Sequence, residues 1–195
     1  MVPDPASLRP RVEGDREQEI LDATLTVLAD AGYDRLTMDA VATEAKASKA
    51  TLYRRWSSKP ELVVDAVCSQ KQHPPTPDTG TLRGDLIAAY CGMGGLGDAR
   101  SMGVLAAVVT AMARDEEFAS AYRRDFIGPK QRAMRTVLEQ AVARGEIRDD
   151  LDLDLIAPAL PGIVLHRVFL LGDEATPELV ARVIDQIILP AVSHS

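Results

Sequence analysis

The chain has few aromatic and few sulfur-containing side chains. Only 4% of its 195 residues are Phe, Trp or Tyr, and its two cysteines, Cys68 and Cys91, form no CxxC or other close pair. A chain of this length buries enough surface to fold without a disulfide or a structural metal. We therefore expect reduced, buried thiols in preference to a redox pair, and we expect no metal site and no cofactor.

The sequence also lacks the motifs of common enzyme sites. Its histidines, His73, His166 and His194, are far apart, and no HExxH motif or Ser or Cys nucleophile beside a base is present. Residues 92–97 fit the pattern G-x-G-x-x-G, but they follow a helical stretch instead of a strand, so we interpret them as a flexible helix end. The sequence predicts that the protein is not an enzyme.

Long hydrophobic runs are scarce. The longest uncharged stretches, such as Ser101–Ala113, fall short of the roughly 18–20 apolar residues of a membrane-spanning helix. The first residues mix proline with both charge signs and contain no apolar signal-peptide core. We expect a soluble, cytoplasmic protein with no membrane partner.

Apolar residues at helical spacing are abundant. Hydrophobic residues make up 46% of the chain and charged residues 26%, which is typical of a globular protein. Periodic apolar positions predict a helix over 16–31, with Asp15 and Gln18 as a capping box and Gly32 as its end. No alternating run predicts a strand. The expected fold is all-α.

Two short helices follow, and only Lys46, Ala47 and Ser48 separate them. Thr37 is placed to cap the first and Ser48 the second, which extends to Trp56. Such a short connection is typical of a helix-turn-helix, although the turn contains no glycine. Ser58 is placed to cap a further helix, with Pro60 and Glu61 in its first turn.

The prolines of residues 72–79 mark a junction between two parts of the chain. We expect a flexible arm over 1–14, a helix-turn-helix domain over 15–71 and a helical body over 79–195. The body is predicted to contain helices near 80–96, 99–113, 115–144, 152–171 and 176–190. Pro158 and Pro161 are expected to bend the fourth of these or to delay its start.

Positive charge is in the minority and is unevenly distributed. The chain has 22 Lys and Arg against 29 Asp and Glu, a net charge of −7, which argues against binding nucleic acid with the whole surface. Yet residues 45–60 hold five cations and no acid. If Leu52 and Trp56 face inward on this helix, Lys49, Tyr53 and Arg54 point outward. Such a face suits a DNA groove, because cations neutralise phosphates and a tyrosine hydroxyl can reach one.

Three segments of the N-terminal part resemble the DNA-binding domain of the TetR (tetracycline repressor) family. They are residues 36–42 (LTMDAVA), 47–56 (ASKATLYRRW) and 58–62 (SKPEL), with Gly32 and Tyr33 before them. The resemblance covers about residues 16–70. It departs from the family pattern at Ala50, where Gly or Pro is common, and at Trp56, where Phe is usual.

The resemblance implies a three-helix DNA-binding head and a larger all-α body that binds a ligand and dimerises. Thr37 and Lys59 would touch phosphates, Lys49, Ala50 and Arg54 would face bases, and Thr51 and Tyr53 would meet the DNA backbone. The complete set expected at DNA is Thr37, Lys46, Ser48, Lys49, Ala50, Thr51, Tyr53, Arg54, Arg55 and Lys59.

The body offers candidates for a pocket and for a dimer interface. Apolar and aromatic residues of the middle helices, with one histidine, are the candidate pocket: Met93, Met102, Leu105, Val109, Met112, Phe118, Tyr122, Phe126, Met134, His166 and Phe169. Apolar residues of the last two helices, which carry more than one inward stripe needs, are the candidate interface: Leu160, Val164, Val168, Val180, Val183, Ile184 and Ile187. Met and aromatic residues at helical spacing are more often ordinary core residues, so each pocket candidate also has that interpretation.

The sequence therefore favours a ligand-responsive repressor that binds a palindromic DNA operator as a homodimer and is released by a small molecule. The alternative is an all-α dimer whose pocket serves a carrier, or whose head serves protein interaction, without specific DNA binding.

Overall fold

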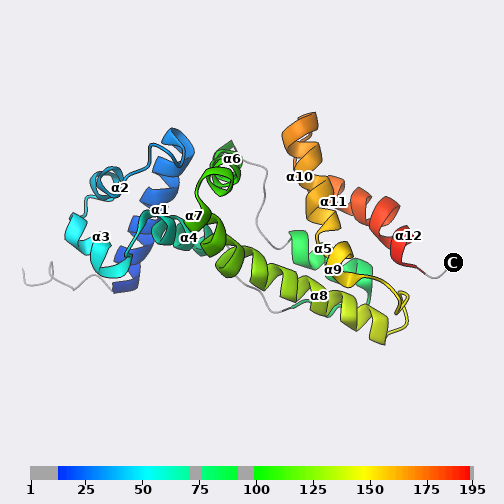
Figure 1. Ribbon diagram of the computed structural model, residues 1–195. Helices are drawn as coiled ribbons and strands as arrows, with labels where there is room; N and C mark the ends of the chain where they lie inside the picture. Colours follow the sequence, from blue (N-terminus) through cyan, green and yellow to red (C-terminus); the bar gives the residue numbers. More distant parts are fainter. Residues whose placement is uncertain (1–12, 71–75, 92–98, 194–195) are drawn as a thin grey trace, which may run out of the picture.

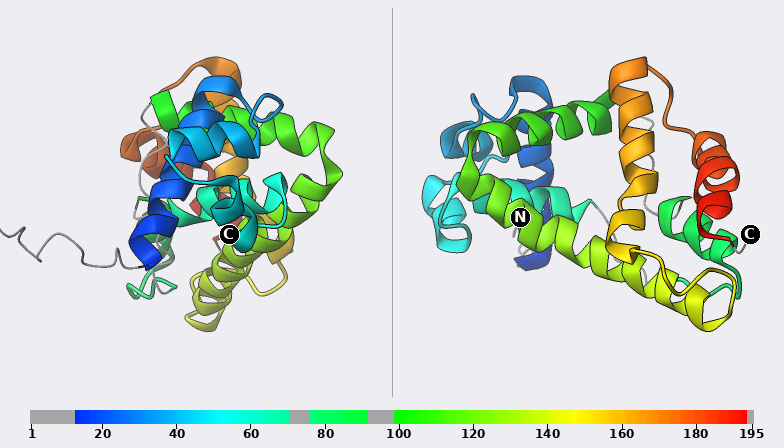
Figure 2. Two further views of the ribbon diagram at one scale, coloured as in Figure 1. Left: turned by 90° about the vertical axis from the view of Figure 1, so that its left-hand side faces the viewer. Right: turned by 45° about the vertical axis from the view of Figure 1, so that its right-hand side comes forward.

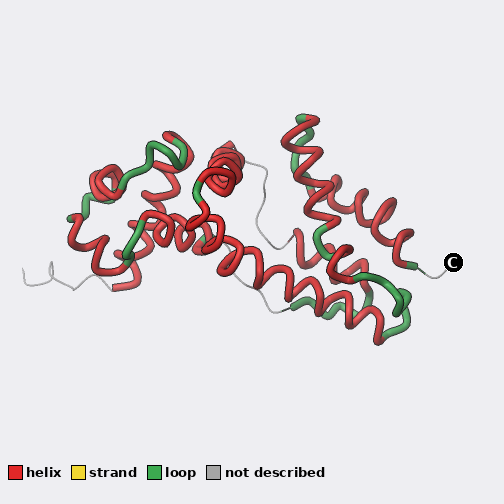
Figure 3. Tube along the Cα trace, in the orientation of Figure 1, coloured by secondary structure: helices red, strands yellow, loops and turns green. Residues whose placement is uncertain are grey.

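The computed structural model describes residues 13–70, 76–91 and 99–193, and within these ranges every regular element is a helix (Figures 1 and 3). The all-α prediction is confirmed. The N-terminal elements are α1 (Glu13–Ala31), α2 (Met38–Glu44), α3 (Lys49–Arg55) and α4 (Lys59–Ser69). The following elements are α5 (Leu82–Cys91), α6 (Ala99–Arg114), α7 (Glu116–Tyr122), α8 (Gly128–Ala143), α9 (Leu153–Ile156), α10 (Ala159–Leu171), α11 (Pro177–Val183) and α12 (Leu189–Val192).

Three of the predicted helix caps of the N-terminal part, those of α2, α3 and α4, are confirmed. The hydroxyls of Thr37, Ser48 and Ser58 accept hydrogen bonds from backbone N–H groups in the first turns of α2, α3 and α4. Helix α1 is already formed at Glu13, the first described residue, so Asp15 lies within the helix and is not the cap that we had expected.

A first hydrophobic cluster joins the N-terminal helices to α6 and α7. It contains Leu25, Leu28, Leu52 and Trp56 from the N-terminal helices and continues into Phe118 of α7. The first cluster therefore extends past the prolines near residue 74, because α6 packs against α1 and α7 packs against α4. Helices α6 and α7 therefore share a core with the N-terminal helices.

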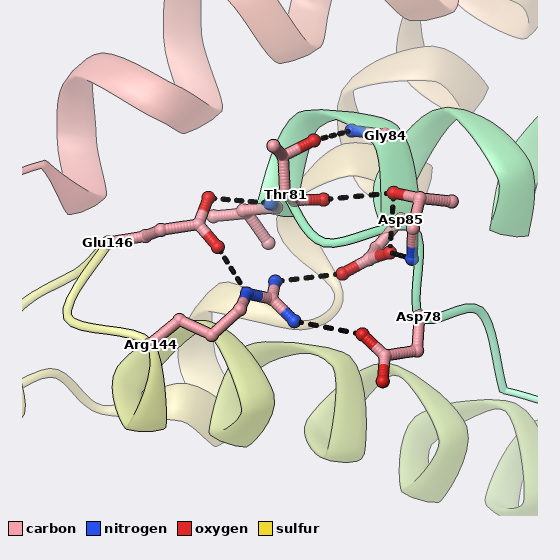
Figure 4. Close-up of polar contacts among 8 residues, drawn as sticks. Asp78, Thr81, Gly84, Asp85, Arg144 and Glu146 are labelled. Atoms are coloured by element: carbon pink, nitrogen blue, oxygen red, sulfur yellow. Dashed lines mark hydrogen bonds and ion pairs between the residues drawn. The ribbon is translucent and has the colours of Figure 1, made fainter.

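A second hydrophobic cluster holds α5, α8, α10, α11 and α12 together. The long helix α8 runs from beside α4 and α7 toward α5 and α9, as Figure 1 and the right view of Figure 2 show. The loop after α8 is tied to the start of α5 by Arg144, whose guanidinium donates to Asp85 (2.8 Å) and to Glu146 (Figure 4). Glu146 also accepts a hydrogen bond from the backbone N–H of Leu82. This network fixes the predicted loop before the last helices.

The helices expected over 115–144 and 176–190 are each interrupted by a π-helical turn. These turns, Arg123–Ile127 and Ile184–Ile188, join α7 to α8 and α11 to α12. A proline follows each turn within two residues, at Pro129 and Pro190, and proline cannot donate the backbone hydrogen bond of a regular helix. The helix expected over 152–171 divides at Pro158, which delays the start of α10 as predicted.

The structure bears on two expected features of the body, the G-x-G-x-x-G stretch and the lack of a segment long enough to cross a membrane. Helix α5 ends by Cys91, and the G-x-G-x-x-G stretch and Met93 lie outside the described residues. The segment Leu153–Leu171 is long and apolar enough to cross a membrane by length and composition, which corrects our expectation from uncharged stretches alone. It buries Leu160, Val164 and Val168 in the second cluster, but only 22% of its most apolar window is buried in the protein.

Candidate nucleic-acid interface

The turn between α2 and α3 is closed without glycine. The backbone N–H of Ala47 donates to the carbonyl of Ala42 (2.8 Å), and that of Lys46 donates to Thr43 (3.1 Å). Lys46 itself adopts a left-handed conformation with φ of 49°. This pattern of hydrogen bonds is a Schellman motif, in which glycine usually takes the left-handed position. The helix-turn-helix expected from the sequence is therefore present, with lysine in place of the usual turn residue.

The inward face of α3 is as predicted. Leu52 and Trp56 are buried, with exposed fractions of 0% and 1%. The indole N–H of Trp56 donates to the carboxylate of Asp65 on α4 (2.8 Å). Because indole carries one donor and this donor is satisfied, tryptophan fits the position where the family usually has phenylalanine.

The opposite face of α3 is open to solvent. Ser48, Lys49, Ala50, Tyr53 and Arg54 are all exposed, and Tyr53 retains 54% of its accessible surface. Thr51 is half-buried, and its hydroxyl lies 2.9 Å from that of Ser48. The structure thus gathers these expected residues on one surface, while their contact with DNA stays a prediction.

Several cations of this surface have partners within the protein. Lys49 pairs with Asp39 of α2 (2.6 Å), and Arg55 pairs with Glu17 of α1 (3.2 Å). The pair of Lys49 is well exposed, so an incoming phosphate can compete for the cation at small cost. Within the described ranges no ion pair involves Arg54 or Lys46.

Lys59 lies differently from the other expected contacts. Its ammonium donates to the backbone carbonyl of Tyr33 (3.1 Å) and lies 3.9 Å from the centre of the Tyr33 ring. Its side chain is half-buried against the loop that follows α1, so it would have to leave Tyr33 to hold a phosphate. Thr37, by contrast, is exposed at the start of α2, with its hydroxyl engaged by the backbone N–H of Ala40.

Tyr33 also connects the N-terminal helices to α7, a contact that the sequence did not reveal. Its hydroxyl donates to Asp115, the N-cap of α7, and its ring centre lies 4.8 Å from that of Phe118. The pKa of Asp115 is lowered, first by the hydrogen bond from the N–H of Phe118 and then by that from Tyr33. The only available sequence signal was Asp115 itself, which precedes two glutamates as helix caps often do.

The described pocket candidates are divided between two hydrophobic clusters. Phe118, Tyr122 and Phe126 form a stacked aromatic row in the first cluster, whereas Met134 is buried in the second. The remaining candidates divide in the same way: Met112 packs on the first cluster, Met102 on the second, Leu105 is half-buried, and Val109, His166 and Phe169 are exposed. Helical spacing identified these residues as inward-facing but could not tell which core each one joins.

A surface hollow of about 370 Å³ lies elsewhere, beside α8 and the loop at 149–154. Its lining is largely charged, with Arg135, Glu139 and Asp154 among its residues, and it contains none of the expected pocket residues.

The residues expected at a dimer interface are mostly core residues of the same protomer. Leu160, Val164, Val168, Val183 and Ile184 are at most 8% exposed, so they do not form an outer surface. Val180 is half-buried and Ile187 is exposed. The expectation is corrected for the five buried residues, because the stripe we assigned to a partner is the one that holds α10 and α11 together.

The geometry of α2, the tight turn and the exposed face of α3 defines a helix-turn-helix, a class of DNA-binding domain whose second helix enters the major groove. Two family models match the chain: "Bacterial regulatory proteins, tetR family" over residues 20–66 and "Tetracyclin repressor-like, C-terminal domain" over residues 76–187. An HTH-type transcriptional regulator of Mycobacterium tuberculosis is 37% identical over 187 residues, which cover 92% of this chain and 89% of that protein.

Further relatives agree with these matches. The DNA-binding transcriptional repressor TetR of Mycobacteroides abscessus is 35% identical over 176 residues, which cover 89% of this chain and 92% of that protein. The crystal structure of the TetR family transcription regulator SCO0332 matches with a TM-score of 0.63 and 26% identity, covering 92% of this chain and 100% of that one. The chain belongs to the TetR family of bacterial transcriptional regulators, which is a family of DNA-binding regulators and not of enzymes.

Proposed function

We propose that this regulator is a cytoplasmic repressor that binds a palindromic operator as a homodimer through α3 and is released by a small-molecule effector. The observation that carries the proposal is the exposed face of α3, where Ser48, Lys49, Ala50, Tyr53 and Arg54 lie together. These residues belong to a cationic segment in a chain whose net charge is −7. Acidic surroundings repel DNA from the rest of the surface and favour docking through this helix.

In the proposed complex, Lys49 and Arg54 meet base edges and Tyr53 places its hydroxyl on a phosphate. Arg55, Lys46 and Thr37 flank this centre. Lys59 holds a phosphate after its ammonium leaves the carbonyl of Tyr33. That exchange would couple DNA binding to the loop that also contacts α7.

The dimer is proposed to form on the outer face of α9 and α10. Positions 155, 158, 162, 166 and 169 recur at helical spacing and are exposed. Large apolar side chains are unusually accessible here, with Leu155 at 71% and Leu170 at 73%, and exposed apolar patches mark interaction sites. A two-fold axis through this face would present two α3 helices to successive major grooves, about 34–36 Å apart.

The effector is proposed to bind along α6. Met102, Leu105 and Val109 of this helix are incompletely buried, and an apolar molecule would remove them from water. The same helix packs on α1 and ends at Arg114, beside the Asp115 contact with Tyr33. An effector that favours another position of α6 would therefore change the placement of α3, through its different affinity for the two conformations.

The test is a binding titration with the duplex upstream of the protein's own gene and an unrelated duplex, at several salt concentrations. Wild type should bind the first duplex more tightly, with a steep negative salt dependence. Lys49→Ala and Tyr53→Ala should each weaken binding by about tenfold, since good contacts to DNA contribute about 1–3 kcal/mol. Arg123→Ala, which removes an exposed cation outside the expected set of DNA contacts, serves as the matched control.

Equal binding of both duplexes at low salt would contradict sequence-specific recognition. If Lys49→Ala and Tyr53→Ala bind as wild type does, the surface of α3 is not the interface.

A further inference from the structure

We propose that Arg16 is a positioning residue of the DNA-binding surface, which holds the turn before α3 in a left-handed conformation that lysine does not favour by itself. The inference rests on the proposed function, because the turn matters through the placement of α3. Arg16 acts through the backbone of Lys46 and needs no contact with DNA.

The strained position is unique among the described residues. Among the described residues, positive φ angles occur at Gly32, Gly80, Gly145 and Gly172. Lys46 is the one described residue other than glycine with a positive φ. A left-handed backbone brings Cβ close to the following carbonyl, so non-glycine residues adopt it only where their surroundings hold them.

A second turn of the same chain, at the end of α8, has the same motif with glycine at the left-handed position. At the end of α8 the backbone N–H of Glu146 donates to the carbonyl of Ala141 (3.0 Å), and the backbone N–H of Gly145 donates to the carbonyl of Val142 (2.9 Å). At the end of α2 the equivalent bonds are present, but lysine stands where Gly145 stands. The two turns thus share their hydrogen bonds and differ in the residue that bears the left-handed backbone.

Arg16 supplies the additional contact at the second turn. Its Nη2 donates to the carbonyl oxygen of Lys46 (2.8 Å), while Nη1 pairs with Glu19 one turn along α1. The guanidinium is therefore fixed on α1 and holds the turn from outside. The next residue, Glu17, pairs with Arg55 at the last position of α3 (3.2 Å). Two consecutive residues of α1 thus contact the chain immediately before α3 and at its end.

The arrangement explains why lysine is compatible with this turn. Lys46 is exposed and lies two residues before Ser48, the N-cap of α3, so its charge adds to the DNA-facing surface. Glycine would relieve the backbone but remove that charge. With Arg16 holding the carbonyl, the protein keeps both the cation and the turn.

The test uses two backgrounds that both lack the charge of residue 46. Lys46→Gly accommodates the left-handed backbone, whereas Lys46→Ala does not. The probe is a DNA duplex selected from a random library by the wild-type protein. Arg16→Ala should weaken binding by about threefold to tenfold in the wild-type and Lys46→Ala backgrounds, the range expected for loss of one hydrogen bond. In the Lys46→Gly background the loss should be under about twofold.

Salt dependence separates positioning from direct contact. Loss of a phosphate contact reduces the slope of log K against log salt by about 0.9, whereas Arg16→Ala should leave this slope unchanged. Equal losses in the alanine and glycine backgrounds, or a reduced slope, would overturn the proposal.

A second readout needs no DNA. Exchange of the Ala47 amide proton, which is bonded to Ala42, should accelerate on Arg16→Ala in the Lys46→Ala background and much less in the Lys46→Gly background. If wild type selects no duplex, the proposed function fails, and this exchange measurement still decides the role of Arg16. Equal acceleration in both backgrounds, or none, would refute it.

Discussion

The hydroxyl of Tyr33 donates a 2.7 Å hydrogen bond to Oδ2 of Asp115 and so joins the DNA-binding head, α1 to α4, to the body. The other carboxylate oxygen of Asp115 caps α7 by accepting from the N–H of Phe118 (3.0 Å). Next to this contact, Arg114 pairs with Asp34 (2.6 Å), and Lys59 binds the carbonyl of Tyr33. One short region therefore links the end of α6, the start of α7 and a predicted phosphate contact.

Tyr33→Phe is expected to lower the free energy of unfolding by about 1–2 kcal/mol, because it removes a hydrogen bond to a charged acceptor and keeps the ring beside Phe118. Chemical denaturation would measure the loss. Tyr53→Phe is the matched control, since its hydroxyl is exposed, and it should change stability by under about 0.5 kcal/mol. Equal effects of the two variants would mean that the hydrogen bond between Tyr33 and Asp115 does not contribute to the free energy of unfolding.

Asp115 should make the free energy of unfolding depend on pH in the acidic range. Its pKa in the folded protein lies below the ordinary value of 3.8, so the unfolded chain binds the proton more readily. The stabilisation is complete above that ordinary value and is lost as the pH falls below it, through the folded-state pKa. Asp115→Asn should flatten the stability curve at pH values below the ordinary 3.8 relative to wild type. Parallel curves for the two proteins would contradict the assigned shift.

Arg144→Met is expected to destabilise the protein by about 3 kcal/mol, because it leaves the fully buried carboxylate of Asp85 without its cation. Burial by itself raises the pKa of Asp85, but hydrogen bonds from Thr79 and Arg144 outweigh burial and lower it. Arg135→Ala, which breaks exposed pairs with Glu139 and Asp154, should cost under about 1 kcal/mol in the same denaturation assay. Adding Asp85→Asn to Arg144→Met should recover part of the loss, and no recovery would contradict the role of the buried charge.

Gly162→Glu is expected to prevent dimerisation without unfolding the protomer. A Cβ at Gly162 meets nothing within 4 Å, so the added side chain enters open space on the outer face of α10. Sedimentation velocity at micromolar concentration should show a dimer for wild type and a monomer for the variant, with unchanged helical circular dichroism. Ala133→Glu places the same side chain at an exposed position of α8 and should remain dimeric. A dimeric Gly162→Glu protein would place the interface elsewhere.

The head could be predicted in detail because its signals are local. Thr37, Ser48 and Ser58 begin their helices by accepting hydrogen bonds from residues three positions away, and the spacing of Leu52 and Trp56 fixes which face of α3 is buried. The body could not be predicted in the same way. Phe118 fits a pocket lining as well as a core, and only its position beside Tyr33 assigns it to the core of the head.

The sequence by itself determined the all-α class, the capped start of α3 and the chemistry of its exposed face, because helix period and capping depend on neighbouring residues. The tertiary structure decided that Lys59 turns toward Tyr33, that Arg16 holds the carbonyl of Lys46, and that Leu160 and Ile184 belong to the protomer's own core. The contacts of Lys59 and Arg16 join residues 26 or more positions apart in the sequence. For Leu160 and Ile184, the structure decides whether an apolar stripe faces the protomer's own core or a partner. Both outcomes depend on how whole helices pack, and helical spacing alone does not fix that.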